Sequence, residues 1–278
     1  MTAARALVVL VCAAGIARAQ ALTTFPRADG ATVRARVYRP TDLCRGIAVL
    51  THGAGGSEDG LAYLGAAMAR DGYLSVVVGH QESGRQALRR EVGARGLRAG
   101  LVEMVSDTAA YTGRLMDVAA ARTWAVPQCA GAAAVLLGHS MGAATVMIEA
   151  GARNGMGVRG ADAFDAYVAL SPQGTGTLFP RGAWSGIHKP VLNITGTRDA
   201  PLNGGSYRTR TEAYAGMSAG CKWLAVVDGA THMDFGGRGG APLVEDLTVR
   251  TVHAFLTGAR FGTCTPPPAE RGVTIDSK

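Results

Sequence analysis

The sequence predicts an α/β domain with a mostly parallel central sheet that is flanked by helices on both faces. Continuous apolar runs, typical of strands buried on both faces, alternate along the chain with segments of helical spacing. The chemically suggestive residues directly follow the carboxyl ends of those runs, where ligands bind in such sheets. The chain of 278 residues is 47% hydrophobic and 18% charged, which is ordinary globular composition and enough for a sizeable core.

The expected elements follow from these patterns in chain order. Apolar or β-branched runs predict strands at Thr32–Tyr38, Gly46–Leu50, Leu74–Val78, Ala132–Leu137, Tyr167–Leu170, Val191–Thr195 and Trp223–Val227. Helical spacing predicts helices at Leu61–Arg70, Leu101–Ala121, Met141–Ala152 and Leu243–Leu256. Residues 81–98, rich in Arg and Gly and without a period, are expected to form a long surface loop. One domain should span residues 20–258, followed by a partly disordered C-terminal tail at 259–278.

The first 19 residues have the pattern of a secretory signal peptide that is cleaved after Ala19. Arg5 precedes the apolar run Ala6–Ile16, and the small residues of Ala17-Arg18-Ala19 follow it. A membrane anchor would need roughly 20 apolar residues, and Val11 is a poor residue before a lipidated Cys12. We therefore expect export to the periplasm or the extracellular space, with no stable membrane insertion.

The charged residues and the cysteines limit the partners. The net charge is +7, but no stretch interleaves basic and aromatic residues as in single-strand nucleic-acid binders, so no nucleic acid is expected. Beyond the leader lie four cysteines, an even number without metal-ligand spacing (Cys44, Cys129, Cys221, Cys264). In an exported chain this favours two disulfides, with three pairings open. Neither a metal nor an organic cofactor is implied.

Ser140 is the candidate nucleophile. The segment Gly138-His139-Ser140-Met141-Gly142 matches the pattern G-x-S-x-G between an expected strand and an expected helix. The glycines permit a tight turn that holds the serine hydroxyl clear of the backbone, near the positive end of the helix. The alternative is a packing turn in which Ser140 only caps the helix.

A serine hydroxyl needs a base, and His232 is the candidate. It lies in a loop directly after the last expected strand, behind Ser140 in the chain as the order serine, acid, histidine requires. The other five histidines precede Ser140, adjoin it, precede a strand or lie within a helix (His52, His80, His139, His188, His253). The alternative for His232 is a loop histidine that caps the next segment.

Asp199 is the candidate for the carboxylate that orients the base. It follows the expected strand Val191–Thr195 and lies between Ser140 and His232 in the chain. Four rivals precede a strand, adjoin the histidine or lie earlier on the same run (Asp162, Asp165, Asp234, Asp228). The backbone N–H groups of Met141 and Ala54 are the expected oxyanion donors, and Ala54 lies in the glycine-rich segment 51–56. A phosphate loop would require a Lys-Ser/Thr pair after these glycines, which is missing.

With these residues in place, the chain resembles the dienelactone-hydrolase-like branch of the α/β-hydrolase superfamily, which includes cutinase-like and platelet-activating-factor-acetylhydrolase-like serine esterases. The resemblance covers residues 30–258 and depends on segments 51–57, 138–142, 195–199 and 229–232. It implies the α/β-hydrolase fold without a large lid, and the disulfides Cys44–Cys129 and Cys221–Cys264. Dienelactone hydrolases have a cysteine nucleophile where this chain has Ser140, which favours ordinary carboxylic esters.

The expected function is therefore that of a secreted serine hydrolase, a carboxylesterase-like enzyme that cleaves small to medium esters. Residues 173–189 are too short for a large lid, and Phe179 and Trp184 within them could contact the acyl group or only anchor the loop on the core. Amide or peptide cleavage and acyl transfer by the same triad are alternatives, and a binding protein without catalytic activity is another.

Overall fold

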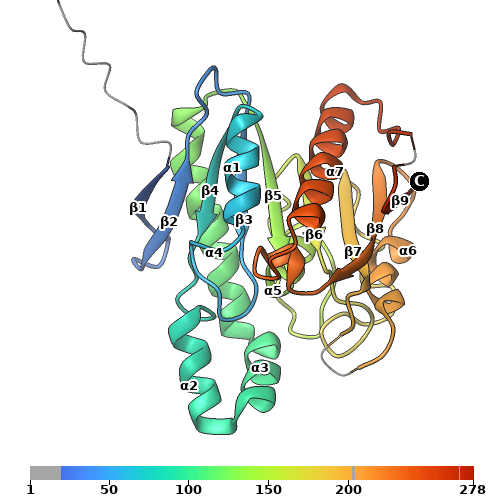
Figure 1. Ribbon diagram of the computed structural model, residues 1–278. Helices are drawn as coiled ribbons and strands as arrows, with labels where there is room; N and C mark the ends of the chain where they lie inside the picture. The colour runs from blue at the N-terminus through green and yellow to red at the C-terminus, as the bar shows by residue number, and fades with distance from the viewer. Residues whose placement is uncertain (1–19, 202–203, 269) are drawn as a thin grey trace, which may run out of the picture.

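The computed structural model describes residues 20–201, 204–268 and 270–278, so the predicted signal peptide lies outside the described residues. These residues form one nine-stranded sheet in the order β1-β2-β4-β3-β5-β6-β7-β8-β9 (Figure 1). The strands are β1 (Gln20–Pro26), β2 (Thr32–Tyr38), β3 (Gly46–Thr51), β4 (Tyr73–Val78), β5 (Ala133–His139), β6 (Ala166–Leu170), β7 (Val191–Arg198), β8 (Lys222–Thr231) and β9 (Val273–Ser277). Strands β3 to β8 run parallel, whereas β1, β2 and β9 run antiparallel to their neighbours. The predicted mostly parallel sheet flanked by helices is confirmed.

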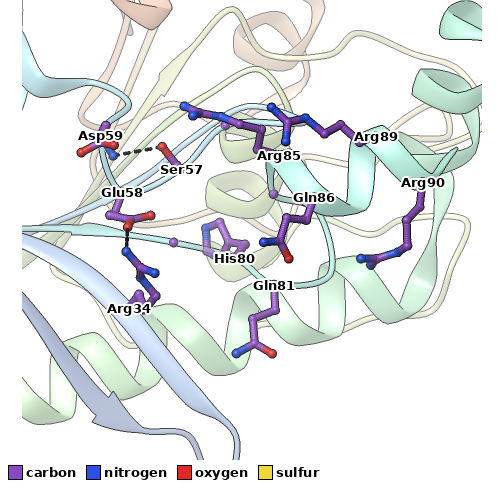
Figure 2. Close-up of a pocket in the computed structure, with 13 residues that line it drawn as sticks. Arg34, Ser57, Glu58, Asp59, His80, Gln81, Arg85, Gln86, Arg89 and Arg90 are labelled. Carbon is purple, nitrogen blue, oxygen red and sulfur yellow. Dashed lines mark hydrogen bonds and ion pairs between the residues drawn. The ribbon is translucent and has the colours of Figure 1, made fainter. Parts of the chain in front are cut away.

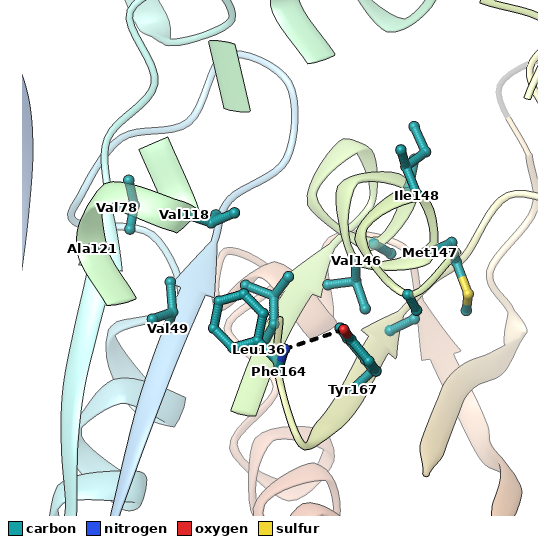
Figure 3. Packing of buried hydrophobic residues seen from close by; sticks show 14 of the residues in the cluster. Val49, Val78, Val118, Ala121, Leu136, Val146, Met147, Ile148, Phe164 and Tyr167 are labelled. Carbon is teal, nitrogen blue, oxygen red and sulfur yellow. Dashed lines mark hydrogen bonds between the residues drawn. The ribbon is translucent and has the colours of Figure 1, made fainter. Parts of the chain in front are cut away.

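Helices cover both faces of the sheet. They are α1 (Ala62–Arg70), α2 (Arg85–Arg95), α3 (Leu97–Ser106), α4 (Thr108–Ala125), α5 (Met141–Glu149), α6 (Glu212–Gly216) and α7 (Pro242–Phe261). Successive residues of the central strands point to opposite faces, so Val49 packs in the same cluster as α4 and α5, while Leu50 packs with α1 and α7. Figure 3 shows the first of these clusters, with Val118 of α4 and Val146 of α5 near Leu136 of β5.

Two edge strands were missed by the sequence prediction. The C-terminal tail expected at 259–278 is wrong in part, because α7 continues to Phe261 and β9 pairs with β8. Strand β1 pairs with β2 at the opposite edge of the sheet. Both edge strands are largely exposed, with Phe25 buried in β1 and Val273 in β9, so neither has the apolar run by which a central strand is identified.

The expected surface loop at 81–98 is also wrong. It forms α2 and the start of α3, a helical pair that projects beyond the end of the sheet after β4 (Figure 1). Helix α2 escaped prediction because it buries only Ala87 and so lacks an apolar stripe. The single helix expected at Leu101–Ala121 is divided at Asp107, whose carboxylate accepts a hydrogen bond from Ala109 N–H and starts α4.

Two disulfides link segments at the end of the sheet opposite the candidate nucleophile. Cys44 and Cys129 precede the neighbouring strands β3 and β5 and are bonded, with their Cα atoms 5.7 Å apart. Cys221, before β8, is bonded to Cys264, beyond α7, at a Cα separation of 5.5 Å. Both pairings implied by the resemblance are thus present. Within the described residues, no helix has the length and apolar character needed to cross a membrane.

Candidate active site

Ser140 lies on the sharp turn between β5 and α5. Its φ of 57° and ψ of −116° are a strained conformation for a residue with a side chain. A Cβ on Gly138 would lie 2.3 Å from the carbonyl oxygen of Gly142, and a Cβ on Gly142 would lie 2.1 Å from that of Thr51. Both glycines are therefore required by close backbone approach, as the sequence pattern predicts, and the turn raises the Ser140 hydroxyl above the sheet end.

Three predicted side chains meet at this turn. His232 Nε2 lies 2.9 Å from Ser140 Oγ, and His232 Nδ1 lies 2.9 Å from Asp199 Oδ1. Because Nδ1–H donates to the carboxylate, Nε2 is free to accept the serine proton. Asp199 is fully buried, whereas the His232 side chain is 25% exposed, so the reactive end of the array faces outward. This is the geometry of a Ser-His-Asp triad.

The ionisation of Asp199 suits this arrangement. Burial on its own would raise the pKa of Asp199, but the hydrogen bond from His232 and the nearby charge of Arg210 outweigh burial and leave the pKa below its ordinary value. Thr195 Oγ donates to the second carboxylate oxygen at 2.9 Å. Asp199 is thus a carboxylate at neutral pH, able to hold the His232 tautomer.

The rival residues have other roles. His139 Nε2 donates to the carbonyl oxygen of His232 at 2.8 Å, and burial, with the nearby His232, lowers the pKa of His139 to about 3, so it stays neutral. Asp228 accepts from Thr197 Oγ, and Asp234 accepts from Thr231. His253 pairs with Asp71 on the surface.

The glycine-rich segment 52–56, the oxyanion loop, lies against the nucleophile. A Cβ on Gly53 would come 3.2 Å from Ser140 Cβ. The Gly53 carbonyl accepts from His52 Nδ1 at 2.6 Å, and across a trans peptide the N–H of Ala54 points the opposite way. No described residue accepts a hydrogen bond from Ala54 N–H, and Met141 N–H opens α5, where helical partners are lacking. Both predicted oxyanion donors are therefore unused beside Ser140.

A buried polar network supports the oxyanion loop from behind. The fully buried Arg114 of α4 donates to the His52 carbonyl at 2.7 Å and to Thr51 Oγ at 3.0 Å. The Thr51 hydroxyl is 2.7 Å from His80 Nε2, and His80 Nδ1 is 2.8 Å from Asp117. Burial lowers the pKa of His80 well below its ordinary value, so the ring is neutral. Thr51, His80 and Asp117 mimic a second triad, but their burial assigns them a structural role.

Two cavities open beside the nucleophile, and both are lined by Ser140, His232, Leu101 and Val105. The smaller, of about 150 Å³, lies against the oxyanion loop and reaches Met233. The larger, of about 340 Å³, extends between α3 and residues 173–178. Leu101 and Val105 belong to α3, so one wall of the site precedes Ser140 in the chain and was not expected from the sequence. Residues 173–178, which form the other wall of the larger cavity, belong to the segment 173–189 that the sequence suggested.

The substrate contacts expected at Phe179 and Trp184 are wrong. Phe179 is fully buried and Trp184 is 2% exposed, and both pack in the core cluster with α5. Their rings contact each other, with centroids 5.5 Å apart. Neither residue lines the two cavities. They anchor the loop on the core, which was the alternative interpretation of these residues.

A larger cavity of about 670 Å³ lies next to the end of the oxyanion loop, where Gly56 and Ser57 line it (Figure 2). Helix α2 contributes Arg85, Arg89 and Arg90, and the segment after β4 contributes His80. The carboxylate of Glu58 in this cavity is paired with Arg34. No member of the triad lines this cavity, so its size does not make it the reaction site.

Two residues that support the site were missed by the sequence prediction. Arg114 lies among buried apolar residues of α4, and this charge within an apolar helix face was the available signal. Arg210 lies in the short 3₁₀ helix Tyr207–Thr211, is 5% exposed and approaches Asp199 and His232. Nothing in its local sequence distinguishes it from its exposed neighbour Arg208.

The comparisons with known proteins agree with this architecture. No family model matches the chain, and no curated sequence matches it. Among solved structures, an α/β serine hydrolase homologue from Coxiella burnetii is 16% identical with a TM-score of 0.57, covering 83% of this chain and 96% of the other. A dienelactone hydrolase from Anabaena variabilis is 16% identical, with a TM-score of 0.57 and coverages of 84% and 97%.

An esterase from Pyrococcus furiosus is 15% identical with a TM-score of 0.58, covering 86% of this chain and 92% of the other. These alignments extend over nearly the whole of each neighbour. At such identities the likeness concerns the fold. The chain has the α/β-hydrolase fold, and its structural neighbours include dienelactone hydrolases and an esterase.

Proposed function

We propose that this protein is a serine hydrolase that cleaves carboxylic esters through an acyl-enzyme on Ser140. The observation that carries the proposal is the continuous array from Ser140 Oγ through His232 to Asp199, with both links at 2.9 Å. A nucleophile, a base and an orienting carboxylate in hydrogen-bond contact are the parts that acyl transfer needs. The unused N–H groups of Ala54 and Met141 supply the remaining part.

In the proposed reaction, Ser140 Oγ attacks the ester carbonyl while His232 Nε2 takes the hydroxyl proton. Negative charge develops on the carbonyl oxygen, where the N–H groups of Ala54 and Met141 stabilise it. Asp199 stabilises the imidazolium, which then gives its proton to the departing alkoxide. A water molecule, deprotonated by His232, attacks the acyl-enzyme, and the acid leaves as Ser140 regains its proton.

The two cavities favour small to medium substrates. A cleaved ester has an acyl part and an alcohol part, and the two cavities meet at Ser140 and His232. Volumes of about 150 and 340 Å³ suit short chains or a single ring better than a long lipid. The apolar side chains of Leu101, Val102 and Val105 on α3 favour an apolar substituent in the larger cavity.

We also propose that the protein is exported, with residues 1–19 as the signal peptide and 20–258 as the core of the hydrolase domain. The two disulfides support this proposal, because such bonds persist in oxidising compartments. Sequencing the N-terminus of the protein recovered from the periplasm or medium tests it. A start at Gln20 is expected, and retention of Met1 contradicts cleavage.

The activity is tested with p-nitrophenyl acetate, butyrate and hexanoate and with a fluorophosphonate probe. Wild-type protein should hydrolyse the esters and be labelled on Ser140, whereas Ser140→Ala should lose both. Ser218→Ala, which removes an exposed serine far along the chain, is the matched control and should behave as wild type. Turnover of anilides at the ester rate would favour the amidase alternative. Absence of labelling would favour a binding protein.

A further inference from the structure

Arg210 places a buried positive charge beside the triad. Its Nε lies 3.3 Å from Asp199 Oδ1, and its Nη2 lies 3.3 Å from His232 Nδ1. Since His232 Nδ1–H already donates to Asp199, the approach of Nη2 brings two donors together and is not a second hydrogen bond. The Arg210 side chain is 6% exposed, and the Asp199 side chain is fully buried. A charge so placed acts on the triad with little screening by water.

The guanidinium also binds the loops that carry the triad. It donates to the carbonyl oxygens of Asp199 and Ala200, directly after β7, at 3.4 and 3.3 Å. It donates to those of Ser171 and Pro172, directly after β6, at 3.4 and 3.3 Å. One planar fork of donors thus joins two strand ends, a geometry that a lysine ammonium cannot reproduce.

The loop after β6 needs such support. Ser171 has a φ of 55°, an unfavourable backbone conformation for a residue with a side chain. Leu170 directly precedes Ser171, and its carbonyl oxygen accepts a hydrogen bond from Ser140 N–H at 2.9 Å. The nucleophile turn, the strained residue and Asp199 are therefore connected through Arg210 and β6.

The titratable groups that face Asp199 come from three elements. Arg210 approaches from the 3₁₀ helix, His232 from the loop after β8, and the neutral His139 from the nucleophile turn. In the resting site, the charges of Asp199 and Arg210 cancel. When His232 takes the proton of Ser140, the new imidazolium and the oxyanion also cancel. The array that includes Arg210 is thus neutral both before and during acyl transfer.

We propose that Arg210 is a positioning residue of the ester-hydrolysing site, holding Asp199 as an oriented carboxylate and fixing the loops after β6 and β7. The inference rests on the proposed function, because it assigns Arg210 a role in the reaction of Ser140. It treats Arg210 as acting through Asp199 and His232, without contact to the reacting bond.

Three variants separate this role from a merely structural one. Arg210→Gln removes the charge and most of the fork, Arg210→Lys keeps the charge and loses the fork, and Arg208→Gln is the matched control. Arg208 lies in the same 3₁₀ helix, is exposed and lies over the ring of Tyr207. Rates of fluorophosphonate labelling and of p-nitrophenyl butyrate hydrolysis are measured from pH 4 to 9, with circular dichroism as the check on folding.

Arg210→Gln should slow labelling and kcat on the order of 10–100-fold, because the triad loses its alignment. In the pH–rate profile of this variant, the fall in rate on the acidic side (the acid limb) should lie about one pH unit higher than in the wild type. The reason is that the charge that lowers the pKa of Asp199 is gone, so the Asp199–His232 pair takes up a proton more readily. Arg210→Lys should lose kcat but keep the wild-type acid limb. Arg208→Gln should match the wild type within about twofold.

The proposal is overturned if Arg210→Gln labels at the wild-type rate, or if it slows labelling while its acid limb stays where the wild-type limb lies. If Arg210→Gln does not fold, Arg210→Lys decides the question, and wild-type kcat in that variant is the contrary result. Absence of labelling in wild-type protein removes the proposed function and this inference with it. Labelled wild type with unaffected Arg210 variants removes the inference alone.

Discussion

The backbone of His52 is held by the buried Arg114, whose Nη1 lies 2.7 Å from the His52 carbonyl oxygen. This contact joins the oxyanion loop to α4, which packs against the sheet. The peptide that follows carries Gly53 and the unused N–H of Ala54 beside Ser140. The position of the proposed oxyanion donor therefore depends on a side chain that does not line either of the two cavities at Ser140.

Replacing Arg114 should accordingly impair catalysis. Arg114→Lys cannot bind Thr51, Ser83 and the His52 carbonyl together, so the N–H of Ala54 loses its fixed direction. We expect kcat for p-nitrophenyl butyrate to fall on the order of 10²-fold, with a smaller change in KM. Arg95→Lys, at an exposed ion pair with Glu91, is the control. If the Arg114→Lys variant folds and keeps the wild-type kcat, the oxyanion loop does not need the Arg114 guanidinium to keep its position.

Asp199→Asn should leave the fold intact and remove most of the activity. An amide cannot stabilise the imidazolium and can favour the wrong tautomer of His232, so kcat should fall on the order of 10³–10⁴-fold. Steady-state ester hydrolysis measures the change. Asp228→Asn, at the exposed rival that accepts from Thr197 Oγ, serves for comparison. Equal losses in both variants would mean that the acid of the triad has been misassigned.

The lowered pKa of Asp199 also predicts how stability depends on pH. A carboxyl whose folded pKa lies below its ordinary value of 3.8 stabilises the native state above that pH and ceases to do so as the pH falls through the folded value. The free energy of unfolding of wild type minus that of Asp199→Asn should therefore be larger at pH 7 than at pH 3. Urea denaturation at the two pH values measures it. A difference that grows on acidification contradicts the assignment.

Removing either disulfide should reduce stability and spare the chemistry. Cys44–Cys129 closes a loop of 85 residues and Cys221–Cys264 one of 43, and each is expected to contribute about 2–5 kcal/mol. Because the loop closed by Cys44–Cys129 is about twice as long, this disulfide is expected to contribute about 0.6 kcal/mol more to the free energy of unfolding. Paired Cys→Ser variants can be compared by urea denaturation and by kcat below their transitions. No cysteine lines the cavities at Ser140, so a large loss of kcat in folded protein would be unexpected.

Val105 should limit the length of the acyl chain. It lies on α3 and lines both cavities at Ser140, so Val105→Trp should obstruct them. We expect kcat/KM for p-nitrophenyl hexanoate to fall by about tenfold or more, and that for acetate by less than about threefold. Val126→Trp, at a residue 38% exposed after α4, is the control. Equal losses for the two esters would place the acyl group elsewhere.

The sequence alone indicated the central strands and the residues that now form the triad geometry. Runs such as Leu74–Val78 are continuous because strands buried on both faces need apolar residues throughout, and this makes them visible without a structure. Ser140, Asp199 and His232 follow three such runs, and the parallel sheet brings those ends to one edge. Strict local requirements, as at Gly138 and Gly142, also leave a pattern in the chain.

Only the tertiary structure decided the rest, because the deciding contacts join residues far apart in the chain. Helix α2 and the edge strands β1 and β9 bury too little to leave an apolar pattern. Whether Phe179 and Trp184 face the substrate or the core depends on how their loop packs. Arg210 looks like other arginines until the fold buries it among carbonyl groups and beside a carboxylate, and the contacts of Arg114 with the oxyanion loop likewise appear only in the fold. Spacing locates a nucleophile, but only packing shows what holds it in place.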